Sequence, residues 1–93
     1  MMIGLVTATV SIPHAQSLKD KRSVLRSMKD RIMNSINVSA AEVGKQDLWQ
    51  RADLAFVTVA ADSETVQKRM SDISSMLRSD PRYVLTELHT QML

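Results

Sequence analysis

The chain has 93 residues, which predicts a single domain, because domains usually run about 50–200 residues. It contains no cysteine and two glycines, which excludes disulfide scaffolds, iron–sulfur clusters, thiolate zinc sites and glycine-rich phosphate loops. The net charge of +2 favours no class of partner, so the distribution of charge along the chain matters more than its total.

The first half of the chain predicts a strand and a helix. Residues 2–12 are apolar on both faces, which is typical of a central strand, and Pro13 ends it by removing a backbone donor. No basic flank or cleavage site marks this stretch as a secretory signal, so we expect a cytoplasmic protein. Ser17 predicts a helix N-cap, with Asp20 three residues on. The helix runs to Ile36, with apolar residues at helical spacing: Leu18, Leu25, Met28, Ile32 and Ile36.

The second half predicts two strands, a helix and a last strand. Residues 37–44 form a weaker strand ending at Gly44, a connector follows, and residues 52–61 form a strongly apolar strand. Asp62 or Ser63 caps the second helix, and the pair Asp80–Pro81 ends it. The apolar face of this helix consists of Val66, Met70, Ile73 and Leu77, with Met76 alongside. Residues 82–93 alternate as an outer strand.

The predicted order of elements is therefore βαββαβ. Right-handed crossovers place both helices on the same side of the sheet. We predict one ferredoxin-like α+β domain over residues 1–93, with a four-stranded antiparallel sheet in the order 4-1-3-2 and two helices on one face. Because the first and third strands are apolar on both faces, we also expect a homodimer or larger assembly that covers the outer sheet face.

Two stretches of the chain are distinctive. Residues 17–32 read SLKDKRSVLRSMKDRI, and residues 37–57 read NVSAAEVGKQDLWQRADLAFV. In this order they resemble the YlxP-like family of small bacterial proteins. The resemblance implies a ferredoxin-like fold and a family of unknown function, with no catalytic residues to carry over. Family genes often lie beside those for ribosome-binding factor A and a translation initiation factor, which implies ribosome or RNA work by association.

Positive charge concentrates in the predicted first helix. Residues 18–36 hold six basic and two acidic residues, whereas the rest of the chain is net negative. Four of the basic residues form a stripe about 80° wide beside the apolar face, which we call the basic stripe: Lys19, Arg22, Arg26 and Lys29. Such a stripe can bind RNA phosphates through charge and counterion release. The alternative is a solvated helix face, whose aliphatic stems cover the core edge and where Asp30 partly neutralises Arg26.

The single tryptophan lies in a polar connector. Trp49 is surrounded in the sequence by Gln46, Asp47, Gln50 and Arg51. A tryptophan beside an arginine can stack on a base or anchor a protein contact. The alternative is structural: Trp49 covers the open end of an aromatic-poor core, while Asp47 or Arg51 satisfies backbone groups of the loop.

Small-ligand, metal and catalytic sites have weaker support. The first-turn amides of the first helix form a candidate anion site with His14, Lys21 and the start of the basic stripe, but the cap residues compete for those amides. His14 and His89 lie far apart in sequence, with no carboxylate at helical ligand spacing, so we predict no metal. No serine lies in a GxSxG setting, so we predict no catalytic residue and no cofactor.

Two functions remain after these exclusions. The first is a non-enzymatic factor that associates with RNA or the ribosome through the basic stripe. The second is a self-associating protein-interaction module that uses the uncovered sheet face. Glu42 and Asp53 are candidates to pair with lysine or arginine on neighbouring elements, and the sequence leaves open which residues those are.

Overall fold

The computed structural model describes residues 1–93, and its six elements follow the predicted order. They are β1 (Met2–Ser11), α1 (Leu18–Ser35), β2 (Ser39–Gly44), β3 (Arg51–Ala60), α2 (Ser63–Arg78) and β4 (Val84–Met92). All strand pairs are antiparallel, and the sheet has the order β2-β3-β1-β4. The predicted ferredoxin-like fold and strand order are therefore confirmed.

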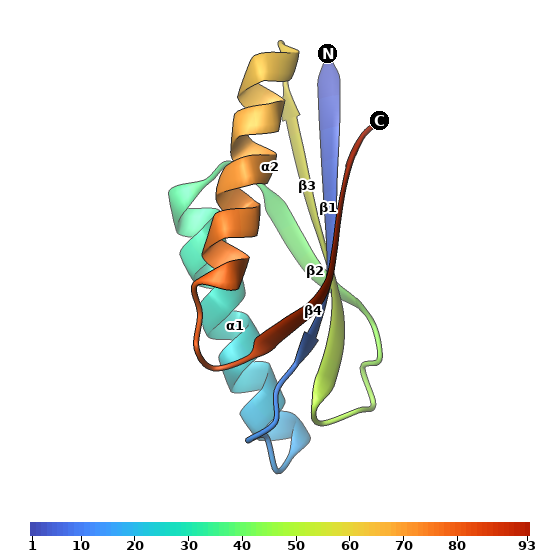
Figure 1. Ribbon diagram of the computed structural model, residues 1–93, viewed down its shortest axis with the longest axis vertical. Coiled ribbons are helices and arrows are strands. Elements are labelled where there is room, and N and C mark those ends of the chain that lie inside the picture. Colours follow the sequence, from blue (N-terminus) through green and yellow to red (C-terminus); the bar gives the residue numbers. More distant parts are fainter.

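Both helices pack on the same face of the sheet, so the molecule has two layers with the core between them (Figure 1). The core is aliphatic apart from Phe56 and Tyr83. From β1 and β3 it receives Val6, Ala8, Val10, Ala52, Leu54 and Phe56, and from the helices Leu25, Met28, Ile32, Val66, Met70, Ile73 and Leu77. The apolar stripes predicted for the two helices are thus the buried ones. Neither helix is long and apolar enough to cross a membrane.

The outer face of the sheet carries the second apolar set of the two central strands. This set consists of Ile3, Leu5, Ala55, Val57 and Val59. Val57 and Val59 expose 41% and 53% of their surfaces, and the other three are partly buried. The even-numbered set that includes Val6 and Phe56 faces the helices. Alternation in the sequence alone does not show which of the two sets does so.

Side-chain caps fix the start of each helix. The Ser17 hydroxyl accepts a hydrogen bond from the Asp20 amide at 3.0 Å, and the Asp20 carboxylate accepts one from the Gln16 amide at 3.0 Å. Asp62 rather than Ser63 caps α2, accepting from the Thr65 amide at 2.8 Å. Ser17 and Asp20 therefore occupy the N-terminus of α1, where the anion site is predicted.

The helix α2 lies close against β1 at Gly4. A Cβ atom at this position would lie 2.5 Å from Val66 Cγ1 and 2.9 Å from Met70 Sδ. The contact therefore needs a residue without a side chain, and Gly4 allows α2 to lie close against the central strand.

Candidate nucleic-acid interface

The side chain of Lys21, a residue of α1, is buried between this helix and β2. It is 1% exposed, and its ammonium nitrogen lies 2.7 Å from Glu42 Oε2 on β2. The same nitrogen donates a hydrogen bond to the backbone oxygen of Lys45 at 2.7 Å. The predicted pairing of Glu42 is therefore confirmed, but the assignment of Lys21 to an anion site is wrong, because folding directs its charge inward to β2.

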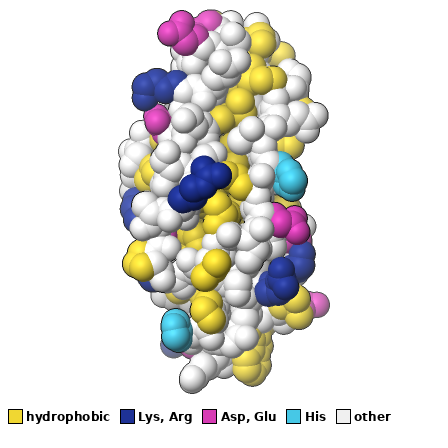
Figure 2. All heavy atoms as spheres, in the orientation of Figure 1, with side chains coloured by type: hydrophobic (Ala, Val, Ile, Leu, Met, Phe, Trp, Pro, Cys, Tyr) yellow, Lys and Arg dark blue, Asp and Glu magenta, His cyan; other side chains and the backbone are white.

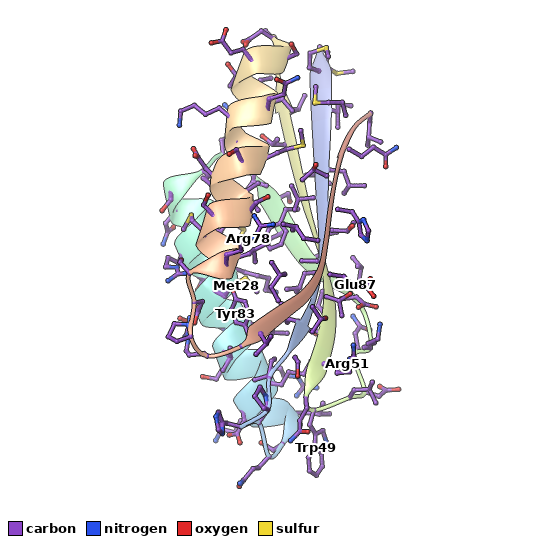
Figure 3. The ribbon with its side chains drawn as sticks, viewed as in Figure 1. Met28, Trp49, Arg51, Arg78, Tyr83 and Glu87 are labelled. Carbon is purple, nitrogen blue, oxygen red and sulfur yellow. The ribbon has the colours of Figure 1, made fainter.

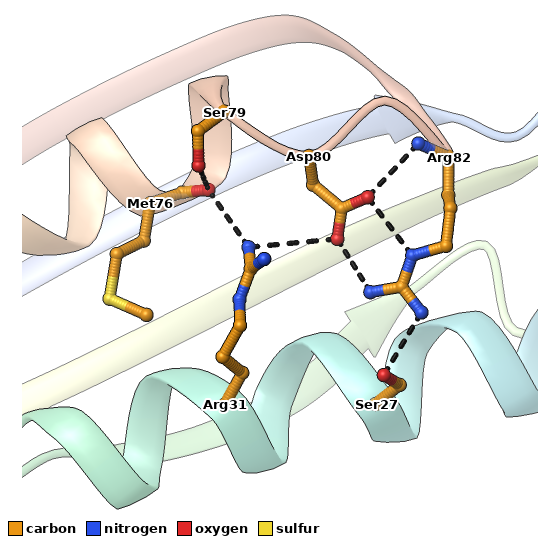
Figure 4. A network of polar contacts seen from close by, with 6 residues as sticks. All are labelled: Ser27, Arg31, Met76, Ser79, Asp80 and Arg82. Atoms are coloured by element: carbon orange, nitrogen blue, oxygen red, sulfur yellow. Dashed lines mark hydrogen bonds and ion pairs between the residues drawn. The ribbon is translucent and has the colours of Figure 1, made fainter.

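Arg31 is paired on the opposite flank of α1, in the network shown in Figure 4. The Asp80 side chain is 1% exposed, and its carboxylate accepts hydrogen bonds from the Arg82 guanidinium at 2.6 and 3.0 Å. These bonds hold the pKa of Asp80 below its usual value. The Arg31 guanidinium lies 3.6 Å from the same carboxylate and donates to the Met76 carbonyl, while Arg82 also donates to the Ser27 hydroxyl. The network fixes α1 to the end of α2 and the loop after it.

These two pairings leave the basic stripe as the unpaired positive charge of α1. Lys19, Arg22 and Arg26 are exposed and Lys29 is half-buried, and none of the four forms an ion pair with a carboxylate. The predicted partial neutralisation of Arg26 by Asp30 does not take the form of an ion pair. The four cations of α1 without an ion pair are thus the same four that helical geometry groups together.

Two shallow grooves lie beside the basic stripe. The first has a volume of about 740 Å³, and its lining is wholly polar: Lys19, Arg22, Ser23, Arg26, Ser27 and Asp30. The second is smaller, about 190 Å³, and lies between α1 and the edge strand β2, where Leu25 and Met33 add apolar surface. Arg22 and Arg26 line both grooves, so they stand on the ridge between them. Serine hydroxyls in the first groove add neutral hydrogen-bond donors to the charged ones.

The connector between β2 and β3 projects from one end of the molecule. Trp49 is 53% exposed and points away from the body of the protein, near Arg51 (Figure 3). The prediction that Trp49 covers the core is therefore wrong, and Tyr83 is the second aromatic residue of the core instead. The predicted hydrogen bonds from Asp47 or Arg51 to backbone groups of the loop are not formed. Gln50 donates hydrogen bonds instead, to the carbonyls of Pro13 and Ala15 at 3.2 and 3.0 Å.

The two hydrogen bonds of Gln50 place the connector beside the loop that leads into α1. Another side chain, Gln46, donates to the Glu42 carbonyl at 3.3 Å. Lys45 has a positive φ of 59°, and its carbonyl accepts hydrogen bonds from the Lys21 ammonium and the Leu48 amide. The Lys45 ammonium pairs with the Asp53 carboxylate at 2.7 Å, which confirms the predicted pairing of Asp53. Hydrogen bonds from Lys45 lower the pKa of Asp53. Trp49 and the start of the basic stripe therefore lie at the same end of the molecule.

Residues 3–90 match the family described as "Protein of unknown function (DUF503)". The chain belongs to this family. It is also 33% identical over 90 residues to "Uncharacterized protein YlxP" of Bacillus subtilis (strain 168), with 97% of this chain and 98% of the relative covered. The predicted resemblance to the YlxP-like family is thereby confirmed.

Among solved structures, this DUF503 chain is similar to "Structure of the REP associates tyrosine transposase bound to a REP hairpin". The TM-score is 0.51 at 11% identity, and the match covers 98% of this chain and 55% of that one. The DUF503 chain thus spans about half the length of that solved relative. At this identity the likeness shows the fold alone.

The remaining candidate residues of the DUF503 chain are dispersed. His14 is exposed before α1, and His89 lies on β4, 4.0 Å from Glu87. No group of three histidine or acidic side chains gathers where a metal could be held. The helical pattern alone does not reveal Arg82, which reaches α1 from the loop before β4 and donates a hydrogen bond to the Ser27 hydroxyl.

Proposed function

We propose that this DUF503 protein is a non-enzymatic factor that binds RNA, ribosomal RNA in particular, through the basic stripe of α1. The observation that carries the proposal is how the folded chain divides the basic residues of this helix. Lys21 and Arg31 are paired with acidic residues, whereas all four members of the stripe remain unpaired and accessible on one flank. Unpaired cations grouped in this way are available to phosphates without first breaking a contact in the protein.

The dimensions of the stripe suit a phosphate backbone. Lys29 lies ten positions after Lys19, which corresponds to about 15 Å along the helix axis. Arg22 and Arg26 lie at its centre and can each donate two parallel hydrogen bonds to a phosphate. Ser23 and Ser27 lie in the adjacent groove as further donors. Because all these groups contact phosphates rather than base edges, we expect the protein to bind structured RNA with little sequence preference.

Reversal of the two central charges tests this proposal. We expect Arg22→Glu/Arg26→Glu to lower affinity for ribosomal RNA at least about tenfold, since two charge-assisted phosphate contacts are replaced by repulsion. The free energy of unfolding should change by less than about 1 kcal/mol, because both side chains are exposed. Fluorescence anisotropy with labelled RNA measures the affinity, and urea titration measures the stability.

The matched control changes the same amount of charge on the other helix. Lys68→Glu/Arg78→Glu alters two exposed residues of α2 and lowers the net charge by the same amount. We expect this variant to retain most of the affinity. Equal losses in the two variants would mean that RNA responds only to net charge, and unchanged affinity in both would mean that the stripe is only a solvated face.

A second candidate function is self-association through the uncovered outer face of the sheet. The exposure of Val57 and Val59 favours it, because Ile3, Leu5 and Ala55 continue the same apolar surface. We expect light scattering at micromolar concentration to give the mass of a dimer or larger assembly. The mass of a monomer, about 10.4 kDa, would contradict this candidate.

A further inference from the structure

The open edge of the sheet at β4 presents a long row of backbone groups that no other strand pairs with. β4 has nine residues, Val84–Met92, and contains neither lysine nor proline, the residues that commonly protect an edge from pairing. Its only irregularity is a bulge near Thr86. The other edge strand, β2, has six residues and lies beside the basic stripe. We propose that two copies of this chain join along their β4 edges, forming a continuous eight-stranded antiparallel sheet with Leu88 on the two-fold axis.

The hydrogen bonds inside the sheet show which backbone groups are free. The Leu93 amide donates to the Ile3 carbonyl at 2.9 Å, continuing the register that pairs Gly4 with Met92. Backbone bonds alternate along an antiparallel strand, so odd-numbered residues from 87 to 93 face β1. Leu88, Thr90 and Met92 therefore present their N–H and C=O groups to the open edge. These groups can form a second ladder without disturbing the first.

The side chains of β4 select a register for that ladder. With Leu88 opposite its symmetry mate, Glu87 of each copy lies directly opposite His89 of the other, on the outer face. The carboxylate can accept a hydrogen bond from the imidazole in both symmetry-related pairs. A register centred on Thr90 would instead place His89 opposite Gln91 and would leave Glu87 opposite Leu93. The register centred on Leu88 thus places opposite charges against each other in both symmetry-related pairs, which favours a second copy of this chain as the partner.

The groove beside β4 accommodates the same arrangement. It lies between α2 and β4, has a volume of about 510 Å³, and is lined mostly by polar side chains, Arg78 among them. An apolar strip runs along this side of the molecule (Figure 2). Met70 and Leu88 supply apolar lining, while Ser71, Ser74 and Ser75 form the wall on α2. Residues opposite each other across paired strands share a face, so Leu88 of the second copy would enter this groove.

This inference shares self-association with the second candidate function above but places it at the β4 edge, so the two geometries are alternatives that the cross-links below distinguish. The inference does not depend on RNA binding, because the basic stripe lies toward β2, which is the edge strand opposite β4. A dimer joined through β4 would leave two basic stripes exposed. Oligomeric state measured without RNA therefore tests the geometry separately from the proposed RNA binding.

Single cysteines provide the test, since the natural chain has none. Directly opposed residues of a hydrogen-bonded antiparallel pair have Cα atoms about 5.5 Å apart, within the range that a disulfide spans. We expect Leu88→Cys to form a disulfide-linked dimer under mild oxidation. Gln91→Cys, on the same strand but away from the axis, and Val57→Cys, on the outer face, should remain unlinked. Circular dichroism checks that each variant is folded.

Charge exchange tests the register independently, including the case in which Leu88→Cys does not fold. We expect Glu87→Lys to weaken the dimer by roughly tenfold in sedimentation velocity, because two symmetry-related pairs are lost. The double variant Glu87→Lys/His89→Glu should restore most of the affinity. A monomeric wild-type protein would overturn both the inference and the self-association behind it. A dimer that cross-links through Val57→Cys, or whose affinity is the same in the wild-type protein and in Glu87→Lys, would overturn the β4 geometry alone.

Discussion

Replacement of Ile32 by aspartate is expected to unfold the domain at 25 °C. Ile32 is fully buried on the face of α1 that packs against the sheet. Loss of its side chain costs about 2–5 kcal/mol, and burial of an unpaired carboxylate adds several more. A domain of this length has roughly 5–14 kcal/mol of stability in total. Far-UV circular dichroism and thermal melting measure the result.

The adjacent residue supplies the control for this prediction. Met33→Asp introduces the same carboxylate one position later, where the methionine side chain is 38% exposed. We expect this variant to remain folded, with a free energy of unfolding within about 1 kcal/mol of the natural protein. If Ile32→Asp melts cooperatively at the natural midpoint, α1 does not pack on the sheet through this face.

Replacement of Lys21 by methionine is expected to cost about 2–4 kcal/mol of unfolding free energy. Methionine keeps most of the side-chain volume, so the loss comes from the charge. Without the ammonium group, Glu42 loses the cation of its ion pair, and the Lys45 carbonyl loses its hydrogen-bond donor. Removing one partner of a buried ion pair is costly because the other charge stays behind. Urea unfolding measures the change.

A second substitution distinguishes the pair from simple packing. In Lys21→Met/Glu42→Leu both charges are removed together, and we expect stability to return to within about 1 kcal/mol of the natural protein. Additive losses in the double variant would show that Lys21 and Glu42 contribute separately. A cost below about 0.5 kcal/mol for Lys21→Met alone would show that the ion pair does not hold α1 to β2.

The fold was predictable because every element carries its own signal in the sequence. Period-two alternation marks the strands, helical spacing marks α1 and α2, and Pro13 and Pro81 interrupt the pattern between elements. Alternation could not show which side of a doubly apolar strand faces the helices. That depends on the packing of α2 at Gly4, a contact between residues more than 60 positions apart in the chain.

The candidate site was predictable in part. Helical geometry alone groups the basic stripe, and the same geometry places Lys21 between Met28 and Ile32 on the apolar face, a sign of burial that a count of charges overlooks. The pairing of Arg31 with Asp80 had no local signal, because it joins α1 to a loop that follows α2. The exposure of Trp49 had none either, since the loop position of an aromatic residue does not reveal what it contacts.

The salt dependence of RNA binding tests the central claim, that α1 binds phosphates through its four unpaired cations. Affinity for ribosomal RNA is measured over a range of potassium chloride concentrations for the natural protein and for Arg22→Glu/Arg26→Glu. Four phosphate contacts predict a slope of roughly −3 in a plot of log affinity against log salt, and loss of two predicts a slope nearer −1.5. A slope near zero in the natural protein, or the same slope in both proteins, would contradict the claim.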